Sequence, residues 1–440
     1  MYKKVFVAVL FGMALFFVAS FVFTQTQALL VGVIASLVVL WTNEGLPIGV
    51  VSLLPIILFP ALDILGTNAT STNYSKSIIF LFLGGFMIAI AVEKTGLHKI
   101  IANKMISMFP STIRGIIFAL AITSGVLSSF LSNTTTTLLL MPLALFLTDN
   151  VNIKMRFALA IAYGASVGGI MTPIGTPPNL ILMGILEQHH IEPIAFATWF
   201  NMVAPLAIVM FFIVSFVLSI GAEDVKITKD ESVKAMNKDQ KKVMYALLGL
   251  VVLLFVNAPI KPYYGGLGLN EKGILLGFGL MMFAPPFNIL KWEDSKKIPY
   301  EIIFLFGAGF SIAAAFTATG LSQAIANYLL DITNLPPFIL LLSIAALITF
   351  TTEITSNTAL ISMMLPVLYA VTQTAGLDPK LFMMVATICA SYAFMLPIAT
   401  PPNAIAMSSG VVRIKDMAKF GIVFNIAGIL LISTVAYFFW

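Results

Sequence analysis

The sequence predicts an all-α polytopic membrane protein with about 11 transmembrane helices and two re-entrant hairpins, arranged in two inverted-topology repeats. Of the 440 residues, 59% are hydrophobic and 10% are charged, whereas soluble domains carry about 25% charged residues. Many apolar runs approach the roughly 20 residues that a helix needs to cross the hydrocarbon. A polar Ser-Asn-Thr motif interrupts two of these runs, at 132–134 and 356–358.

The apolar runs can be assigned in chain order. Two long runs carry the Ser-Asn-Thr motif at their centres and predict re-entrant hairpins over 113–148 and 336–373. Two others are interrupted by prolines and predict broken helices over 155–187 and 381–410. The other spans are expected at 5–23, 28–41, 46–63, 76–93, 197–220, 243–258, 270–287, 300–318 and 418–439, with amphipathic extensions to about 108 and 331.

These runs divide the chain into an N-terminal span (1–27), a first repeat (28–221), a polar cytoplasmic linker (222–242) and a second repeat (243–440). The start of the chain resembles a signal peptide, because two lysines precede an apolar run. That run is longer than a usual signal-peptide core, and another apolar run follows almost at once. We therefore expect the first span to remain uncleaved.

The two repeats share one register. Ser356 lies 224 residues after Ser132 (356 − 132), and Ala399 lies at the same offset from Gly175. Chance similarity between apolar segments does not explain matched Asn, Pro, Gly and Thr residues. Further pairs at this offset are Thr95 and Thr319, Gly96 and Gly320, Asn103 and Asn327, Pro142 and Pro366, and Pro173 and Pro397.

The basic residues predict the orientation, because cytoplasmic loops are enriched in Lys and Arg. An N-terminus inside the cell places 20 of the 24 basic residues on the cytoplasmic side and the C-terminus outside. Arg114 and Lys154 flank the first hairpin, whereas only Lys380 lies near the second. The hairpins therefore enter from opposite faces of the membrane, which we expect to be the cell inner membrane. The basic residues expected outside are Lys76, Lys261, Lys272 and Lys380.

The broken helices predict binding chemistry. The Pro-Pro pairs at 177–178 and 401–402 lack backbone donors and clash with a continuing helix. Irregular backbone within a membrane survives only inside protein or beside water. The freed carbonyls and nearby hydroxyls suit a monovalent cation such as sodium, and half-helix N-termini suit a carboxylate. Inverted repeats with broken helices and a midplane site are typical of secondary transporters.

Charge supports the same chemistry. No Lys or Arg lies near the four motif stretches in the sequence, so bound cations would supply the charge that an anionic substrate needs. Glu353 is a candidate because acids within membranes are usually functional, but its counterpart is Ser129, and we expect a supporting role. The single Cys389 and three scattered histidines indicate neither a disulfide nor a zinc site.

The duplicated Ser-Asn-Thr motif, the stretches Gly-Thr-Pro-Pro-Asn (175–179) and Ala-Thr-Pro-Pro-Asn (399–403), and the span layout resemble the divalent anion/sodium symporter family (DASS, INDY-type) over nearly the whole chain. In that family the hairpin tips and helix breaks form a substrate site with a sodium site on each side. The resemblance implies sodium ligands at Ser128, Ser132, Asn133 and Gly175, and at Thr352, Ser356, Asn357 and Ala399. It implies substrate contacts from Asn133, Thr134, Thr176, Pro177, Asn357, Thr358, Thr400 and Pro401.

The resemblance also implies sodium-driven uptake of C4-dicarboxylates such as succinate, malate or fumarate by a homodimer. A scaffold domain (5–63 and 243–287) would hold the dimer contacts, a transport domain would move as an elevator, and the stretches 94–108 and 319–331 would connect them. No catalytic residues or organic cofactor are implied. Sodium-independent exchange and transport of citrate or sulfate remain alternatives. An ion channel would need a continuous pore, and an enzyme would need a nucleophile–base pair or a metal cluster.

Overall fold

The computed structural model describes residues 2–43, 45–222, 235–259, 263–333 and 335–440. The described chain is all-helical, as predicted. Most of the expected linker (223–234) and Lys261 lie outside the described residues.

The first part of the chain forms the expected N-terminal helices and two short helices that the sequence does not predict. The additional pieces, α4 and the 3₁₀ helix η1, precede α5 and were not predicted, because their polar sequence carries no membrane-span signal. Gly96 ends α5 in the left-handed conformation with φ 71°, which glycine adopts without steric cost. The elements are α1 (Tyr2–Ala19), α2 (Gln25–Asn43), α3 (Ile48–Ala61), α4 (Thr67–Ser71), η1 (Thr72–Ser75), α5 (Ser77–Thr95) and α6 (Leu97–Ser107).

The expected hairpins and broken helices each form two separate helices. In the first repeat these are α7 (Ile113–Ser128), α8 (Asn133–Phe146), α9 (Val151–Gly169) and α10 (Pro177–Gln188), followed by α11 (Phe196–Ser219). In the second repeat they are α16 (Pro337–Thr352), α17 (Asn357–Thr374), α18 (Pro379–Ala390) and α19 (Pro401–Ser408), followed by α20 (Ile414–Phe439).

The remaining helices open the second repeat. Helix α12 starts at Lys238, before the expected span at 243–258 and within the expected linker. Asn237 and Gln240 form a reciprocal capping box there, which satisfies backbone donors at the helix start. The elements are α12 (Lys238–Asn257), α13 (Glu271–Met281), η2 (Trp292–Lys297), α14 (Tyr300–Thr319) and α15 (Leu321–Thr333).

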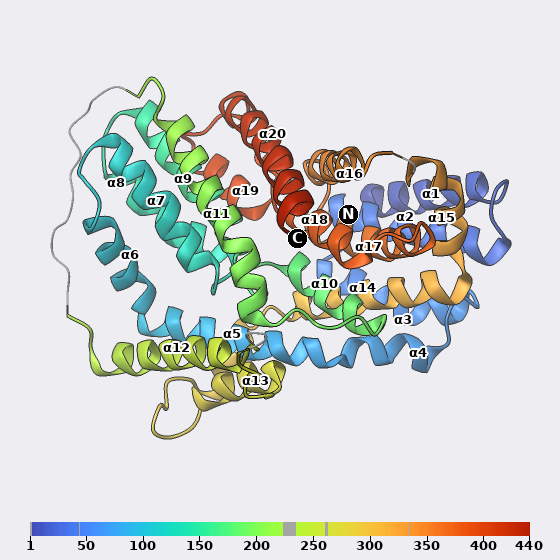
Figure 1. The fold of residues 1–440 in the computed structure, drawn as a ribbon, viewed down its shortest axis with the longest axis horizontal. Helices are drawn as coiled ribbons and strands as arrows, with labels where there is room; N and C mark the ends of the chain where they lie inside the picture. The colour runs from blue at the N-terminus through green and yellow to red at the C-terminus, as the bar shows by residue number, and fades with distance from the viewer. Residues whose placement is uncertain (1, 44, 223–234, 260–262, 334) are drawn as a thin grey trace.

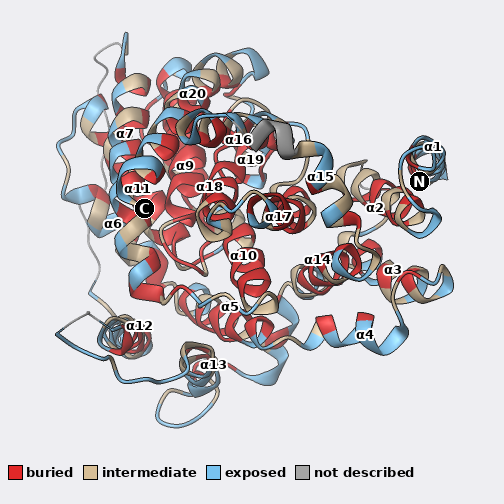
Figure 2. Ribbon diagram, turned by 45° about the vertical axis from the view of Figure 1, so that its right-hand side comes forward, coloured by how far each residue is buried: buried red, intermediate tan, exposed pale blue. Residues whose placement is uncertain are grey.

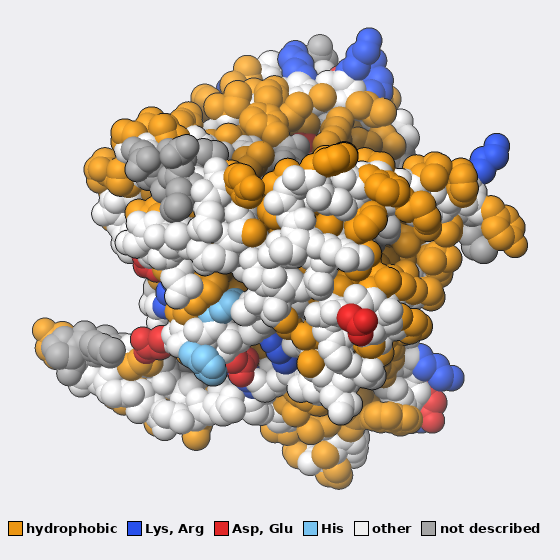
Figure 3. Space-filling model, turned by 90° about the vertical axis from the view of Figure 1, so that its right-hand side faces the viewer, with side chains coloured by type: hydrophobic (Ala, Val, Ile, Leu, Met, Phe, Trp, Pro, Cys, Tyr) orange, Lys and Arg blue, Asp and Glu red, His pale blue; other side chains and the backbone are white. Residues whose placement is uncertain are grey.

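Six helices within the described residues are long and apolar enough to cross a membrane: α1, α2, α4–α5 taken together, α11, α14 and α20. Figure 1 shows α6–α8 at one end of the molecule, α1–α4 at the other, and the broken helices between them. The buried residues concentrate in these central helices, especially α9, α10 and α18 (Figure 2). Hydrophobic side chains cover much of the face in Figure 3, as expected for a surface that meets lipid.

Candidate functional site

The Ser-Asn-Thr motifs lie at the tips of the two hairpins. Asn133 begins α8 and Asn357 begins α17, so each motif provides the first residues of a helix. Ser132 caps α8, where its Oγ accepts a hydrogen bond from the backbone N of Thr135 at 3.1 Å. Ser356 holds the same position in α17 without a side-chain cap. Both tips therefore present backbone N–H groups that no carbonyl of the helix accepts, although side chains accept those of Thr135 and Thr358.

The Thr-Pro-Pro-Asn motifs lie at the helix breaks. The first break separates α9 from α10, and the second separates α18 from α19. Thr176 and Thr400 occupy equivalent N-cap positions with nearly identical backbone angles, φ −145°, ψ 144° and φ −143°, ψ 148°. The prolines follow in the first turn, where a missing N–H costs nothing. Residues 224 positions apart in the sequence therefore occupy equivalent positions at the two breaks.

Asn179 and Asn403 close the two breaks in the same way. The Nδ2 of Asn179 donates to the carbonyls of Gly169 and Thr172 at 3.3 and 2.9 Å. The Nδ2 of Asn403 donates to the carbonyls of Ala393 and Leu396, both at 3.0 Å. These acceptors are related by the 224-residue offset. The sequence analysis assigns no role to these two asparagines, although both belong to the duplicated motif.

Several buried oxygens at the breaks have no partner. The Oδ1 atoms of Asn179 and Asn403 and the Oγ1 of Thr176 are buried without a hydrogen bond to any described residue. Buried polar atoms are nearly always hydrogen-bonded. These amide and hydroxyl oxygens are hard donors of the kind that alkali and alkaline-earth cations prefer. The breaks therefore carry spare acceptors inside the protein.

The structure brings three of the four residues implied for the first sodium site close together. Ser128 donates its Oγ proton to the Oδ1 of Asn133. The side chain of Asn133 lies against Gly169, where an added Cβ would come within 2.7 Å of its Oδ1. A Cβ on Gly175 would come within 2.4 Å of the Gly169 carbonyl oxygen. The side chain of Ser132 is exposed and instead bonds Thr135.

The second set is arranged differently. Thr352 is fully buried and donates from Oγ1 to the Ala390 carbonyl at 3.1 Å, so it contacts the end of α18 and not the hairpin tip. Asn357 accepts through Oδ1 from the N and Oγ1 of Thr358, at 2.7 and 3.1 Å. Ala399 is buried within the second break. The described contacts do not join Ser356 to Ala399.

The implied substrate-binding residues fall on the same four stretches. Thr134 is half-buried at the first tip, whereas Thr358 is buried at the second. Thr176 and Thr400 are buried, Pro177 is half-buried and Pro401 is exposed. The structure therefore places these residues at helix N-termini, with different access to solvent.

The two repeats interlock at these stretches. Helix α19, which follows the second break, packs against α8 and α9 of the first repeat. Helix α10, which follows the first break, packs against α17 and α18 of the second. Each hairpin tip is therefore followed by a helix that contacts the broken helix of the other repeat. In the described part of the chain, no Lys or Arg side chain bonds to the four motif stretches, and no cluster of His, Cys, Asp and Glu could hold a metal ion.

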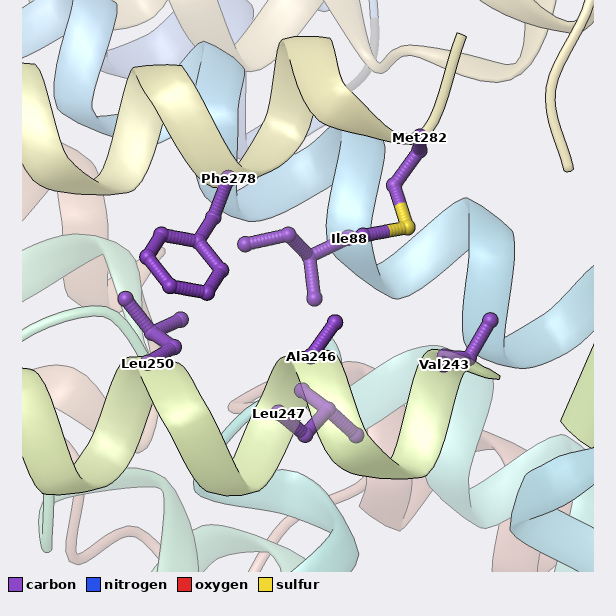
Figure 4. A pocket seen from close by; sticks show the side chains of 7 residues that line it. All are labelled: Ile88, Val243, Ala246, Leu247, Leu250, Phe278 and Met282. Atoms are coloured by element: carbon purple, nitrogen blue, oxygen red, sulfur yellow. The ribbon is translucent and has the colours of Figure 1, made fainter. Parts of the chain in front are cut away.

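One gap in the packing lies elsewhere. It lies between α5, α12 and α13, is too narrow to hold a water molecule and is lined only by apolar side chains (Figure 4). Such a lining offers no partner to a carboxylate. The lining residues are Ile88, Val243, Ala246, Leu247, Leu250, Phe278 and Met282.

Comparison with known proteins places the chain in a family. A family model described as a citrate transporter matches residues 37–388. The chain belongs to this citrate transporter family. It is also 32% identical over 432 residues to the sodium-dependent dicarboxylate transporter SdcS of Staphylococcus saprophyticus, covering 90% of this chain and 83% of the relative. The SdcS protein of Staphylococcus aureus is 32% identical over 433 residues, with the same coverage.

These matches confirm the resemblance to divalent anion/sodium symporters. A member of the citrate transporter family is an integral membrane transporter and not an enzyme.

Two solved structures share the fold at low identity: Neisseria gonorrhoeae MtrF (TM-score 0.62, 14% identity, 95% of this chain and 97% of that chain) and the Alcanivorax borkumensis YdaH transporter (TM-score 0.60, 15% identity, 85% and 87%).

Proposed function

We propose that this protein couples inward sodium flow to the uptake of C4-dicarboxylates such as succinate, malate and fumarate. The observation that carries the proposal is the paired construction of the helix breaks, in which Asn179 and Asn403 each retain a buried amide oxygen without a partner among the described residues. The name of the SdcS relatives, sodium-dependent dicarboxylate transporter, supports the choice of ions.

The substrate would bind at the helix starts. The tips and breaks begin four helices, α8, α10, α17 and α19, and helix N-termini stabilise anions through free N–H groups and the helix dipole. Two separate pairs of helix starts suit a molecule with two carboxylates. The proposed substrate contacts are Asn133, Thr134, Thr176, Pro177, Asn357, Thr358, Thr400 and Pro401.

Sodium would supply the missing positive charge. The stretches offer hydroxyl, amide and carbonyl oxygens but no bound cationic side chain among the described residues, so a dianion alone would bring uncompensated charge into the site. A cation on each side lowers the desolvation cost of the anion, and the anion does the same for the cations. The proposed sodium ligands are Ser128, Ser132, Asn133 and Gly175, and Thr352, Ser356, Asn357 and Ala399.

The proposed movement is an elevator in a homodimer, with the N-terminus inside the cell. Two features support it. The hairpins and broken helices pack on each other. The joints to the connecting helices α6 and α15 are matched, since Gly96 and Gly320 both adopt positive φ, 71° and 69°. The scaffold would comprise the spans before α4 together with α12 and α13, and the repeats would have inverted topology.

A second candidate substrate is citrate, because the family model that matches the chain is described as a citrate transporter. The chemistry of the helix starts is the same for a tricarboxylate. A citrate site would have to neutralise three carboxylates, whereas a C4-dicarboxylate site neutralises two.

Uptake of radiolabelled succinate into proteoliposomes tests the proposal. We expect accumulation with an inward sodium gradient and an empty lumen, and none when choline replaces sodium. Uptake only after the lumen is preloaded with dicarboxylate would show exchange and overturn sodium coupling. Stronger competition by citrate than by malate would instead favour the tricarboxylate.

A further inference from the structure

Glu353 is a buried acid next to the proposed second cation site. It directly follows Thr352 at the end of α16, and only 3% of its surface is exposed. Its Oε1 accepts from the backbone N of Met395 at 2.9 Å, and its Oε2 accepts from the N of Leu396, also at 2.9 Å. The carboxylate thus holds two consecutive backbone donors of the break between α18 and α19.

Asn425 of α20 completes this arrangement. Its Nδ2 donates to the Oε1 of Glu353 at 2.6 Å, and its Oδ1 accepts from the backbone N of Phe394 at 3.2 Å. Three consecutive backbone N–H groups, at 394–396, are therefore bonded by one acid and one amide. We call Glu353 and Asn425 the clamp.

The clamp coincides with a longer break. Ala390, the last residue of α18, corresponds to Ser166, whereas α9 continues for three more residues to Gly169. The second break thus loses helical hydrogen bonds that the first retains, and unpaired backbone donors inside a membrane protein are costly. The counterparts of the clamp residues do not replace them: the Oγ of Ser129 bonds its own helix at Val126, and Asn201 is exposed.

The hydrogen bonds around Glu353 suit an ionised carboxylate. Three donors, two backbone N–H groups and one amide, point at the two oxygens of Glu353, and an ionised carboxylate is an acceptor only. Among the described residues, no Lys or Arg forms an ion pair with this acid. The partners of Glu353 are therefore neutral donors that favour its ionised form, and it lies one residue from a proposed cation ligand.

We propose that Glu353 is a positioning residue for the second cation site, where its charge and the clamp make this site bind sodium more tightly than a neutral break would. The carboxylate holds 394–396 unwound, which sets the backbone carbonyls that lead to Ala399. Its charge attracts a cation, because opposite charges interact more strongly inside protein than in water. This inference rests on the proposed sodium-coupled function.

Glu353→Gln removes the charge and nearly preserves the shape. We expect the sodium concentration for half-maximal succinate uptake to rise by about tenfold, the order expected for one charge-assisted hydrogen bond. The KM for succinate at saturating sodium should change less than twofold. The matched control is Ser129→Ala at the equivalent position of the first repeat, which should leave the sodium dependence unchanged.

A fall in maximal rate without a shift in sodium dependence would show that Glu353 only supports the fold, and would overturn the proposal. Asn425→Ala provides a second test if the Gln variant does not fold, since it keeps the charge but removes the amide of the clamp. Sodium-dependent thermal stabilisation of this purified variant should need about threefold more sodium; an unchanged requirement would also overturn the proposal. If the wild-type protein shows no sodium dependence, the proposed function itself fails.

Discussion

The two repeats hold their equivalent motif stretches in different ways. In the first repeat, α9 approaches α7 through glycines: a Cβ on Gly168 would lie 2.1 Å from the Gly125 carbonyl oxygen, and one on Gly164 would lie 2.4 Å from that of Ala121. The first break is also held by Trp199, whose Nε1 donates to the Ile170 carbonyl at 2.8 Å. Neutral groups and close backbone packing therefore support this half.

In the second repeat, larger side chains replace the glycines, and a buried acid holds the break. The positions equivalent to Gly125 and Gly168 are Thr349 and Tyr392, and the Glu353–Asn425 clamp holds the break. The Ser-Asn-Thr and Thr-Pro-Pro-Asn motifs are kept in both repeats, whereas the residues that pack behind them have diverged. The symmetry therefore belongs to the duplicated motifs more than to the packing around them.

The largest effects should be symmetric and fall on the hairpin tips. We expect Asn133→Ala and Asn357→Ala each to abolish succinate uptake, because each removes an amide at a helix start that is proposed to contact both ions. Size-exclusion chromatography should show that both variants remain folded and assembled as the wild type. Normal uptake by either purified variant would refute the site assignment.

The next largest effects should also be symmetric. Asn179→Ala and Asn403→Ala each leave two buried carbonyls of a break without their amide donor, at a cost of about 1–3 kcal/mol for an unsatisfied group. We expect uptake to fall at least tenfold in both variants. A loss confined to one repeat would show that the matched hydrogen bonds serve different purposes.

A glycine substitution should test the close helix packing of the first repeat. Gly168→Ala places a methyl group against the backbone of α7, which no side-chain rotation relieves, and overpacking costs about 1–3 kcal/mol. We expect a lower melting temperature for the purified protein. Gly85→Ala is the control, because no heavy atom lies within 4 Å of its added Cβ. Equal melting temperatures for the two variants would contradict the close packing of α7 and α9.

The smallest effect should come from Asn201→Ala. This residue is the sequence counterpart of Asn425, but it is exposed on α11, and surface substitutions usually change stability by less than about 0.5 kcal/mol. We expect uptake and melting temperature to match the wild type. A marked loss would mean that the first repeat also uses this asparagine.

Sequence reasoning located the hairpins, the breaks and their register, because prolines and polar motifs stand out in apolar sequence. It missed the early start of α12, although Asn237 and Gln240 carry the capping pattern. It also missed the pairing of Glu353 with Asn425 and with the backbone at 395 and 396. Those groups lie on three separate elements, so their contact depends on packing that no local pattern encodes. The orientation, the inverted topology and the ligand assignments remain predictions.

The length of the hairpin helices has a consequence for how the protein is made. Helices α7 and α16 have 16 residues each, roughly 24 Å at 1.5 Å per residue, whereas the hydrocarbon is about 30 Å thick. Neither can cross the bilayer alone, and each ends in a polar tip that lipid does not solvate. Neither hairpin can therefore insert into the bilayer by itself, and each needs neighbouring spans to pack against while the protein is made.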